Sequence, residues 1–174
     1  MIPIRFVRCI ALAVVALAGC SKPPATPPPA AVVDPSGPTH AQPKLPTIQI
    51  WLGPEQMTAE MALTREQEET GMMFRTNMEE NTGMIFVFPF PQPAKFWMKN
   101  CPLPLSAAYI DSDGVIREIH DFEPYNTNTV SSATESIHFV LETPRGWFVR
   151  HNIHEGVTVR TERGSLMETF KLQR

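Results

Sequence analysis

Cysteine, basic charge and long apolar segments are all scarce in this chain. Its 174 residues include only three cysteines, which is too few for a disulfide-based framework. Lysine and arginine number 15 against 18 acidic residues, and no basic tract occurs, so we expect no nucleic-acid partner. The longest uncharged apolar run, residues 9–18, is too short to span a bilayer, which takes about 20 residues.

That short run belongs to an expected signal peptide, residues 1–19. Arg5 and Arg8 precede the run, and small residues follow it immediately before Cys20. The ending Leu-Ala-Gly-Cys resembles the lipobox of bacterial lipoproteins, in which the cysteine is acylated and becomes the first residue of the mature chain. The resemblance implies that the membrane is a partner through lipid on Cys20. The alternative is an ordinary signal peptide in which Cys20 has no role.

Acylation and cleavage would have consequences for location and charge. Several acyl chains anchor a protein stably, because each buried CH2 contributes about 0.8 kcal/mol. The residue after the cysteine is Ser21 and not aspartate. By resemblance to Gram-negative sorting rules this points to the outer membrane, so we expect the protein to lie on its periplasmic face. Cleavage would leave 13 basic against 18 acidic residues, a net charge of −5. Cys101 would then be a lone thiol, and we expect it to be buried.

Residues 20–46 are predicted to be a disordered tether that follows the lipidated cysteine. Nine of the 18 prolines fall in residues 21–46, and only three residues there are charged. Such a composition buries little apolar surface and favours an extended chain. At about 3.1 Å per residue it could reach on the order of 80 Å.

Residues 47–174 are long enough for a single domain, and their patterns favour β-structure. A capping box over residues 64–67 and a glycine at 71 predict one short surface helix over residues 65–70. The proline-rich segment 89–93 is expected not to pair in a sheet. The fold class is therefore a mostly-β sandwich or flattened barrel. Strands are predicted over residues 47–51, 57–63, 84–88, 95–99, 105–110, 115–119, 137–141 and 157–161.

Four motifs follow one another in the chain: Gly71-Met72-Met73-Phe74-Arg75, Gly83-Met84-Ile85-Phe86-Val87-Phe88, Phe96-Trp97-Met98-Lys99-Asn100-Cys101 with Pro104-Leu105-Ser106, and Tyr109-Ile110-Asp111. Phe139-Val140-Leu141-Glu142 and Gly146 form a further segment. Over about residues 57–161, these segments resemble domain-of-unknown-function family 192.

The resemblance implies a jelly-roll-like β fold and no established activity. Two positions depart from the family pattern: Cys101 stands where the family has threonine, and Ser106 where it has aspartate. If the family uses that aspartate in a polar site, this chain has lost the carboxylate.

Arg75, Lys99, Asn100 and Glu142 are the polar residues of these motifs. One hypothesis is that they line a pocket for a small polar ligand, to which Arg75 gives a bidentate fork and Lys99 a point charge. The alternative is structural: Arg75 pairs with Glu142, and Asn100 caps a turn. Trp97 shares a predicted strand face with lysines and is a candidate stacking platform for a sugar ring, with core packing as the alternative.

Metal and cofactor chemistry is not expected. His151 and His154 have weak metal spacing, and a zinc site wants three or four ligands. Cys101 as a nucleophile would need a neighbouring base that lowers its pKa. The leading hypothesis is a lipid-anchored envelope module that binds a small ligand, a glycan or an envelope protein. The alternative is a cell-envelope enzyme that acts on glycans or uses the Cys101 thiol.

Overall fold

The computed structural model describes residues 37–173, which contain ten strands and three short helices. The mostly-β class predicted from the sequence is confirmed. The expected signal peptide, Cys20 and the tether as far as residue 36 lie outside the described residues. Within residues 37–173, no helix is both long and apolar enough to cross a membrane. The strands are β1 (Thr47–Leu52), β2 (Glu55–Ala62), β3 (Thr82–Gln92), β4 (Lys95–Phe96), β5 (Leu105–Asp111), β6 (Ile116–Phe122), β7 (Val130–Ser131), β8 (Ile137–Pro144), β9 (Val159–Thr161) and β10 (Gly164–Ser165).

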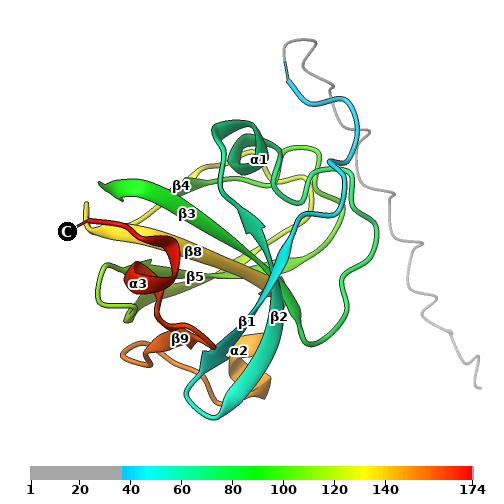
Figure 1. Cartoon of the computed structure of the whole chain (residues 1–174). Coiled ribbons are helices and arrows are strands. Elements are labelled where there is room, and N and C mark those ends of the chain that lie inside the picture. The colour runs from blue at the N-terminus through cyan, green and yellow to red at the C-terminus, as the bar shows by residue number, and fades with distance from the viewer. Residues whose placement is uncertain (1–36, 174) are drawn as a thin grey trace, which may run out of the picture. The chain divides into compact units, whose positions relative to one another are not determined.

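Eight strands form one sheet in the order β10-β9-β1-β2-β3-β8-β5-β6, and β4 pairs with β7 separately. All pairings are antiparallel except β2 with β3, which are joined through helix α1 (Arg65–Thr70). Figure 1 shows β3, β8 and β5 side by side, with the β1–β2 hairpin at a large angle to them. The sheet is not closed, but a bridge between Val115 and Thr158 ties the β5–β6 turn to the segment before β9.

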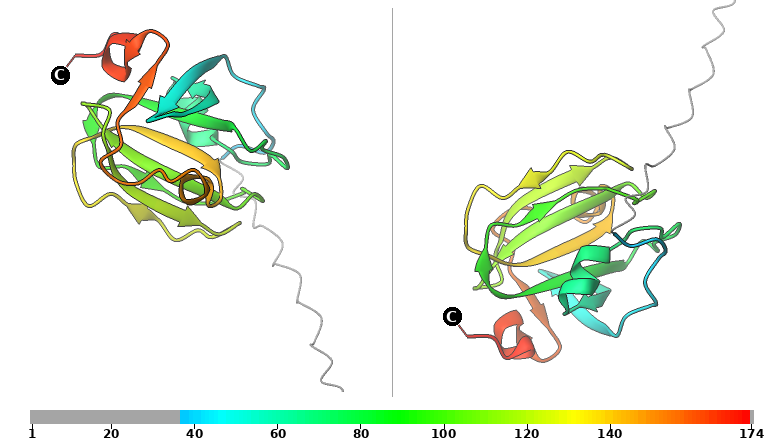
Figure 2. Two further views of the ribbon diagram at one scale, coloured as in Figure 1. Left: turned by 90° about the horizontal axis from the view of Figure 1, so that it is seen from below. Right: turned by 90° about the horizontal axis from the view of Figure 1, so that it is seen from above.

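Two apolar clusters lie on opposite faces of β3, β8 and β5. Along β3, Ile85 contributes to one cluster and Phe86 to the other, because successive side chains of a strand point to opposite faces. Residues 84–88 are therefore apolar on both faces of the strand. Helices α2 (Trp147–Arg150) and α3 (Leu166–Phe170) contribute side chains to the first cluster, which contains Ile85. Helix α1 and β4 lie on the other side of these strands, where the second cluster contains Phe86, as Figures 1 and 2 show.

Helix α1 forms as its sequence predicts. The Thr64 hydroxyl accepts from the Gln67 N–H at 3.3 Å, and the Gln67 side chain accepts from the Thr64 N–H at 3.2 Å. Gly71 ends the helix with a φ of 47°, a conformation that suits glycine. The structure adds α2 and α3 to this one predicted helix.

Two expectations about chain segments are wrong. Strand β3 continues through Pro89 and Pro91 to Gln92, which pairs with Ile137 after an irregular stretch that absorbs the missing proline N–H groups. The strand expected over residues 95–99 is only the two-residue β4, although the alternation of buried Met98 with exposed Trp97 holds.

Residues 42–46, the last part of the expected tether, contact the folded body. Leu45 is buried against the second cluster, and its N–H donates to Glu60 Oε2 at 2.7 Å. The Gln42 side chain donates to the carbonyl of Gly71 at 2.9 Å, and Met61 N–H donates to that of Pro46. The folded body therefore includes at least residues 42–46.

Candidate functional site

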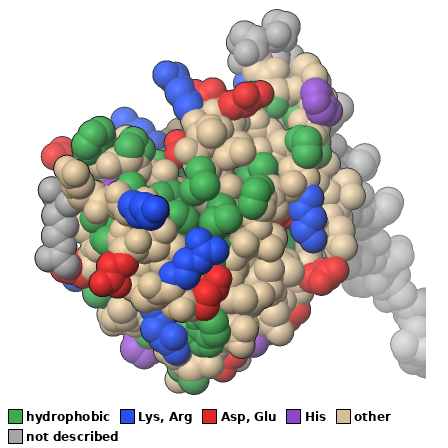
Figure 3. Space-filling model, in the orientation of Figure 1, with side chains coloured by type: hydrophobic (Ala, Val, Ile, Leu, Met, Phe, Trp, Pro, Cys, Tyr) green, Lys and Arg blue, Asp and Glu red, His purple; other side chains and the backbone are tan. Residues whose placement is uncertain are grey.

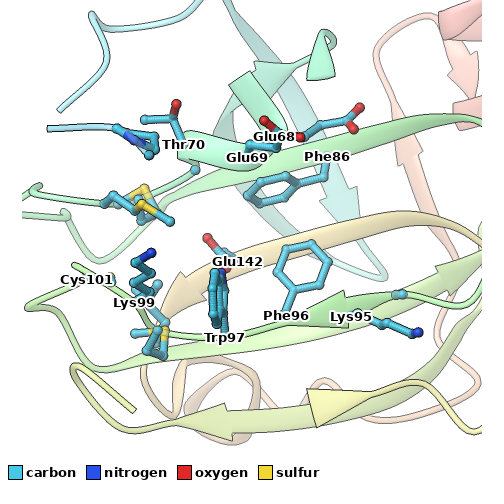
Figure 4. A pocket seen from close by; sticks show the side chains of 18 of the residues that line it. Glu68, Glu69, Thr70, Phe86, Lys95, Phe96, Trp97, Lys99, Cys101 and Glu142 are labelled. Atoms are coloured by element: carbon cyan, nitrogen blue, oxygen red, sulfur yellow. The ribbon is translucent and has the colours of Figure 1, made fainter. Parts of the chain in front are cut away.

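A cavity of about 550 Å³ opens beside the second apolar cluster. One wall is the end of α1 with the turn that follows it, and the other is the segment from Gln92 to Cys101. Phe86 and Phe88 of β3, Leu105 of β5 and Glu142 of β8 also line it, as do Gly37 and Pro38 near the start of the described chain. Figure 4 shows Phe96, Trp97 and Glu142 on one side of the cavity and Thr70 and Phe86 on the other. The volume falls within the range of small-molecule sites, about 300–1,000 Å³.

The α1 wall depends on the turn at Gly71. The Gly71 N–H donates to Gln67 O at 2.8 Å, and the Met73 N–H donates to Thr70 O at 3.0 Å. These bonds turn the chain so that Met72 and Met73 line the cavity with their buried side chains. A Cβ added to Gly71 would meet the Phe86 ring at 3.3 Å, so the turn and the cavity wall are packed together.

Glu142 is the unusual member of the lining. It lies in β8 between Met84 of β3 and Ala107 of β5, and it is only 5% exposed. Its Oε2 is buried and has no hydrogen-bond partner within the described part of the chain. Burial raises the pKa of the Glu142 carboxyl to about 8, with no opposing contribution from a cation. At neutral pH the group is therefore mostly the uncharged acid.

Trp97 and Lys99 lie at the mouth of the cavity. Trp97 is 45% exposed, and Lys99 Nζ lies 5.3 Å from the centre of its ring. Lys95 also contributes to the lining, so the segment around β4 brings two cations to the opening. The structure brings three of the candidate residues, Lys99, Trp97 and Glu142, into the lining of one cavity.

Arg75 does not belong to this group, and neither sequence interpretation of it is correct. Its guanidinium donates two hydrogen bonds to the Glu60 carboxylate, at 2.7 and 2.8 Å, and it does not line the cavity. Both side chains are largely buried, 16% and 13% exposed, so the pair fixes the chain after α1 against β2. Its partner is Glu60, not Glu142.

Asn100 has a structural position next to the cavity without lining it. Its φ of 57° is in the left-handed region, and its carbonyl accepts from the Phe74 N–H at 2.7 Å. The residue is 4% exposed, and its Oδ1 has no hydrogen-bond partner among residues 37–173. Asparagine tolerates this conformation better than most residues, so Asn100 shapes the turn that presents Lys99.

The two departures from the family pattern lie in different surroundings. Cys101 lines the cavity, is 3% exposed and donates weakly to Leu103 O. Burial, and then the nearby Glu142, raises the pKa of its thiol to about 12, which opposes thiolate chemistry. Ser106 lies on the opposite face of β5, donates to Asp121 and accepts from the Gly146 N–H. A carboxylate is thus present beside Ser106, from the neighbouring strand β6.

The other tryptophans and His151 have structural contacts. Trp147 is fully buried, and the Trp51 ring stacks with Arg160. His151 lies between two glutamates, with Nδ1 2.9 Å from Glu55 Oε2, and no group of three His, Cys, Asp or Glu side chains in residues 37–173 could hold a metal. The sequence did not indicate that Thr70, Phe86 and Phe96 share the cavity, because nothing in their spacing shows that α1 faces β4.

The fold and this cavity define a small mostly-β domain with a ligand-sized opening between α1 and the β4 segment. The chain belongs to the DUF192 family, described as an uncharacterized ACR, whose model matches residues 48–161. A structure from Sinorhizobium meliloti 1021, provisionally described as a transcription regulator, is 31% identical with a TM-score of 0.66, covering 70% of this chain and 98% of its own.

A second solved structure, from Novosphingobium aromaticivorans DSM 12444, is a protein of unknown function. It is 28% identical with a TM-score of 0.63, and the match covers 75% of this chain and 92% of its own. The search of curated proteins found no match. The comparisons therefore establish the family and the fold.

Proposed function

We propose that this domain is a binding module for a small, mainly apolar molecule that carries one polar group. The observation behind the proposal is Glu142, a carboxyl 5% exposed in the lining of a 550 Å³ cavity with one oxygen unpartnered. A buried polar atom without a partner costs about 1–3 kcal/mol. A ligand that hydrogen-bonds to it would recover that cost on binding.

The rest of the lining favours a small apolar body over a glycan. Phe86, Phe88, Phe96, Met72 and Met98 present apolar surface, whereas a glycan would need partners for many hydroxyl groups. Trp97 at the mouth can cover one ring of a bound molecule.

A nucleic-acid function, as the description of the Sinorhizobium protein suggests for that protein, has little support in this chain. Its net charge is −3. On the face drawn in Figure 3, basic side chains alternate with acidic ones and form no continuous basic patch. A DNA-binding surface depends on clustered Lys and Arg.

A cysteine-enzyme function is also less well supported than binding. The Cys101 thiol is buried and its pKa is raised to about 12, where a nucleophile needs the pKa lowered. Its hydrogen bond goes to the Leu103 carbonyl and not to a histidine.

The location proposed for this module is the cell envelope, with lipid on Cys20 as its anchor. Support comes from the Leu-Ala-Gly-Cys ending of the apolar run and from the proline-rich stretch after it. Labelled palmitate should be incorporated into the wild-type chain expressed in a Gram-negative host and not into Cys20→Ala. Equal labelling of both chains would refute the anchor.

Three one-ring probes test the cavity: benzamide, benzylamine and benzoate. In protein-observed NMR of the full chain at pH 6, we expect at least one to shift the amide signals of residues 70–73 and 96–99. The signals of α2, on the other side of the sheet, should stay in place. Trp97→Ala should weaken that binding several-fold, because the ring at the mouth is lost.

Trp51→Ala is the matched control, since it removes the same side chain outside the cavity lining. Its binding should equal that of the wild type. Absence of cavity shifts with all three probes would refute the proposed function, as would shifts that spread evenly over the domain.

A further inference from the structure

We infer that the molecule bound in this cavity presents a neutral carboxamide or a similar paired acceptor and donor to Glu142, which binds it as the uncharged acid. The inference rests on the proposed function and specifies the chemical class of the ligand. A protonated carboxyl carries one O–H donor beside one acceptor oxygen. An amide carries the complementary pair, so the two groups can form two parallel hydrogen bonds.

The neighbours of Glu142 give its charged form no support. The adjacent strand residues, Met84 and Ala107, are apolar. On the same face, the Tyr109 hydroxyl donates to the Val130 carbonyl, and the Cys101 thiol donates to Leu103. Both donors are therefore directed away from Glu142, and its Oε2 stays unpartnered.

The charged groups of the cavity belong to its two walls. Lys95 and Lys99 lie on the β4 side, and Glu68 and Glu69 lie on α1. Figure 4 shows the two α1 carboxylates on the wall opposite Glu142. Burial accounts for the raised pKa of Glu142, and none of these four groups contributes to it.

Charged ligands fit these surroundings less well than a neutral amide. An amine would have to ionise Glu142 inside an apolar lining that raises its pKa. A carboxylate would bring a buried negative charge next to a carboxyl group without a fixed cation, which is costly. A neutral amide needs no change in the charge of the site.

The same three probes test the inference at pH 6 and pH 9. At pH 6, benzamide should bind more tightly than benzylamine and benzoate. One pH unit above a pKa of about 8 the uncharged acid falls to about a tenth, so benzamide should bind about tenfold more weakly at pH 9. Glu142→Gln keeps a donor and an acceptor without titrating, so its benzamide affinity should be equal at the two pH values.

Glu155→Gln is the control, because Glu155 is exposed and lies outside the cavity lining. It should reproduce the pH profile of the wild type. Tighter binding of benzylamine or benzoate would overturn the inference and leave the proposed function standing. An unchanged or higher benzamide affinity of the wild type at pH 9 would also overturn the inference. The same holds if Glu142→Gln no longer binds benzamide although its amide spectrum shows that it folds.

Discussion

At the scale of single residues, the carboxyl group of Glu142 lies among apolar side chains that do not compensate its charge. The pKa of this group is raised to about 8 in the folded chain, while the unfolded chain titrates near the ordinary value of 4.5. Between these values the folded state holds a proton that the unfolded state has lost. The contribution of Glu142 to stability is therefore complete below pH 4.5 and is lost as pH rises to about 8.

Glu142→Gln should remove this dependence. The free energy of unfolding of the wild type should fall, relative to the variant, by about 1.4 kcal/mol per pH unit between pH 5 and 8. Urea unfolding of both chains at several pH values measures the difference, and subtraction cancels the other titrating groups. Parallel profiles would show that Glu142 titrates normally in the fold.

The Cys101 thiol gives a second prediction at this scale. Because it is 3% exposed and the pKa of its thiol is raised to about 12, iodoacetamide should modify it only when the chain unfolds. In a chain with Cys9 and Cys20 both replaced by alanine, mass spectrometry should show no labelling at pH 8 over hours and complete labelling in denaturant. Rapid labelling of the folded chain would contradict the burial and would revive the cysteine-enzyme alternative.

Sequence motifs identified three of the residues at the cavity, Trp97, Lys99 and Glu142, because chemically distinctive residues stood out in short ordered segments. The sequence could not identify the partner of Arg75. Glu60 lies in a predicted strand and Glu142 directly follows one, and only the parallel pairing of β2 with β3 decides which of them is near. The raised pKa of Glu142 is likewise a product of packing by distant segments.

At the scale of elements, local signals predicted α1 and most strands well. The capping box and Gly71 fixed both ends of α1, since hydrogen bonds within four residues define them. Strand β3 was underestimated because proline removes only its own N–H group, and an irregular register lets the strand continue to Gln92. Helices α2 and α3 have four and five residues, and such short helices depend on tertiary packing.

The β5–β6 turn offers a test of an element junction. Gly114 has a φ of 77°, and a Cβ there would lie 2.8 Å from the Val159 carbonyl oxygen of β9. Gly156 also has a positive φ, of 90°, but nothing lies within 4 Å of its added Cβ. Gly114→Ala should therefore lower the free energy of unfolding by about 2 kcal/mol more than Gly156→Ala.

Thermal and urea unfolding of the two alanine variants measure that difference. The positive φ is common to both, so the excess cost in Gly114→Ala reports the contact between the β5–β6 turn and β9. Equal losses in the free energy of unfolding would mean that the β5–β6 turn and β9 can move apart to accept the added Cβ.

At the scale of the whole molecule, the segment directly before β1 has contacts that its composition does not indicate. Proline content suggested a tether up to residue 46, yet Gln42 and Leu45 are bound to the body. Composition averages over a window and cannot show that one leucine in it is buried. Leu45→Ala should lower the free energy of unfolding by about 2 kcal/mol or more, because a buried leucine is lost.

Lys44→Ala is the matched control, since Lys44 is its exposed neighbour in the same segment. It should change stability by less than about 0.5 kcal/mol. Urea unfolding of the full chain distinguishes the two outcomes. If both substitutions were equally harmless, residues 42–46 would belong to the tether after all.

The pairing of β1 with β9 has a consequence for how this protein acquires its fold. Ile50 is opposite Thr161, so one edge of β1 pairs with a segment near the end of the chain, while its other edge pairs with the adjacent β2. Closing so long a loop is slow compared with forming local contacts. In a polypeptide that crosses a membrane from its N-terminus, the sheet could be completed only after β9 had been synthesised.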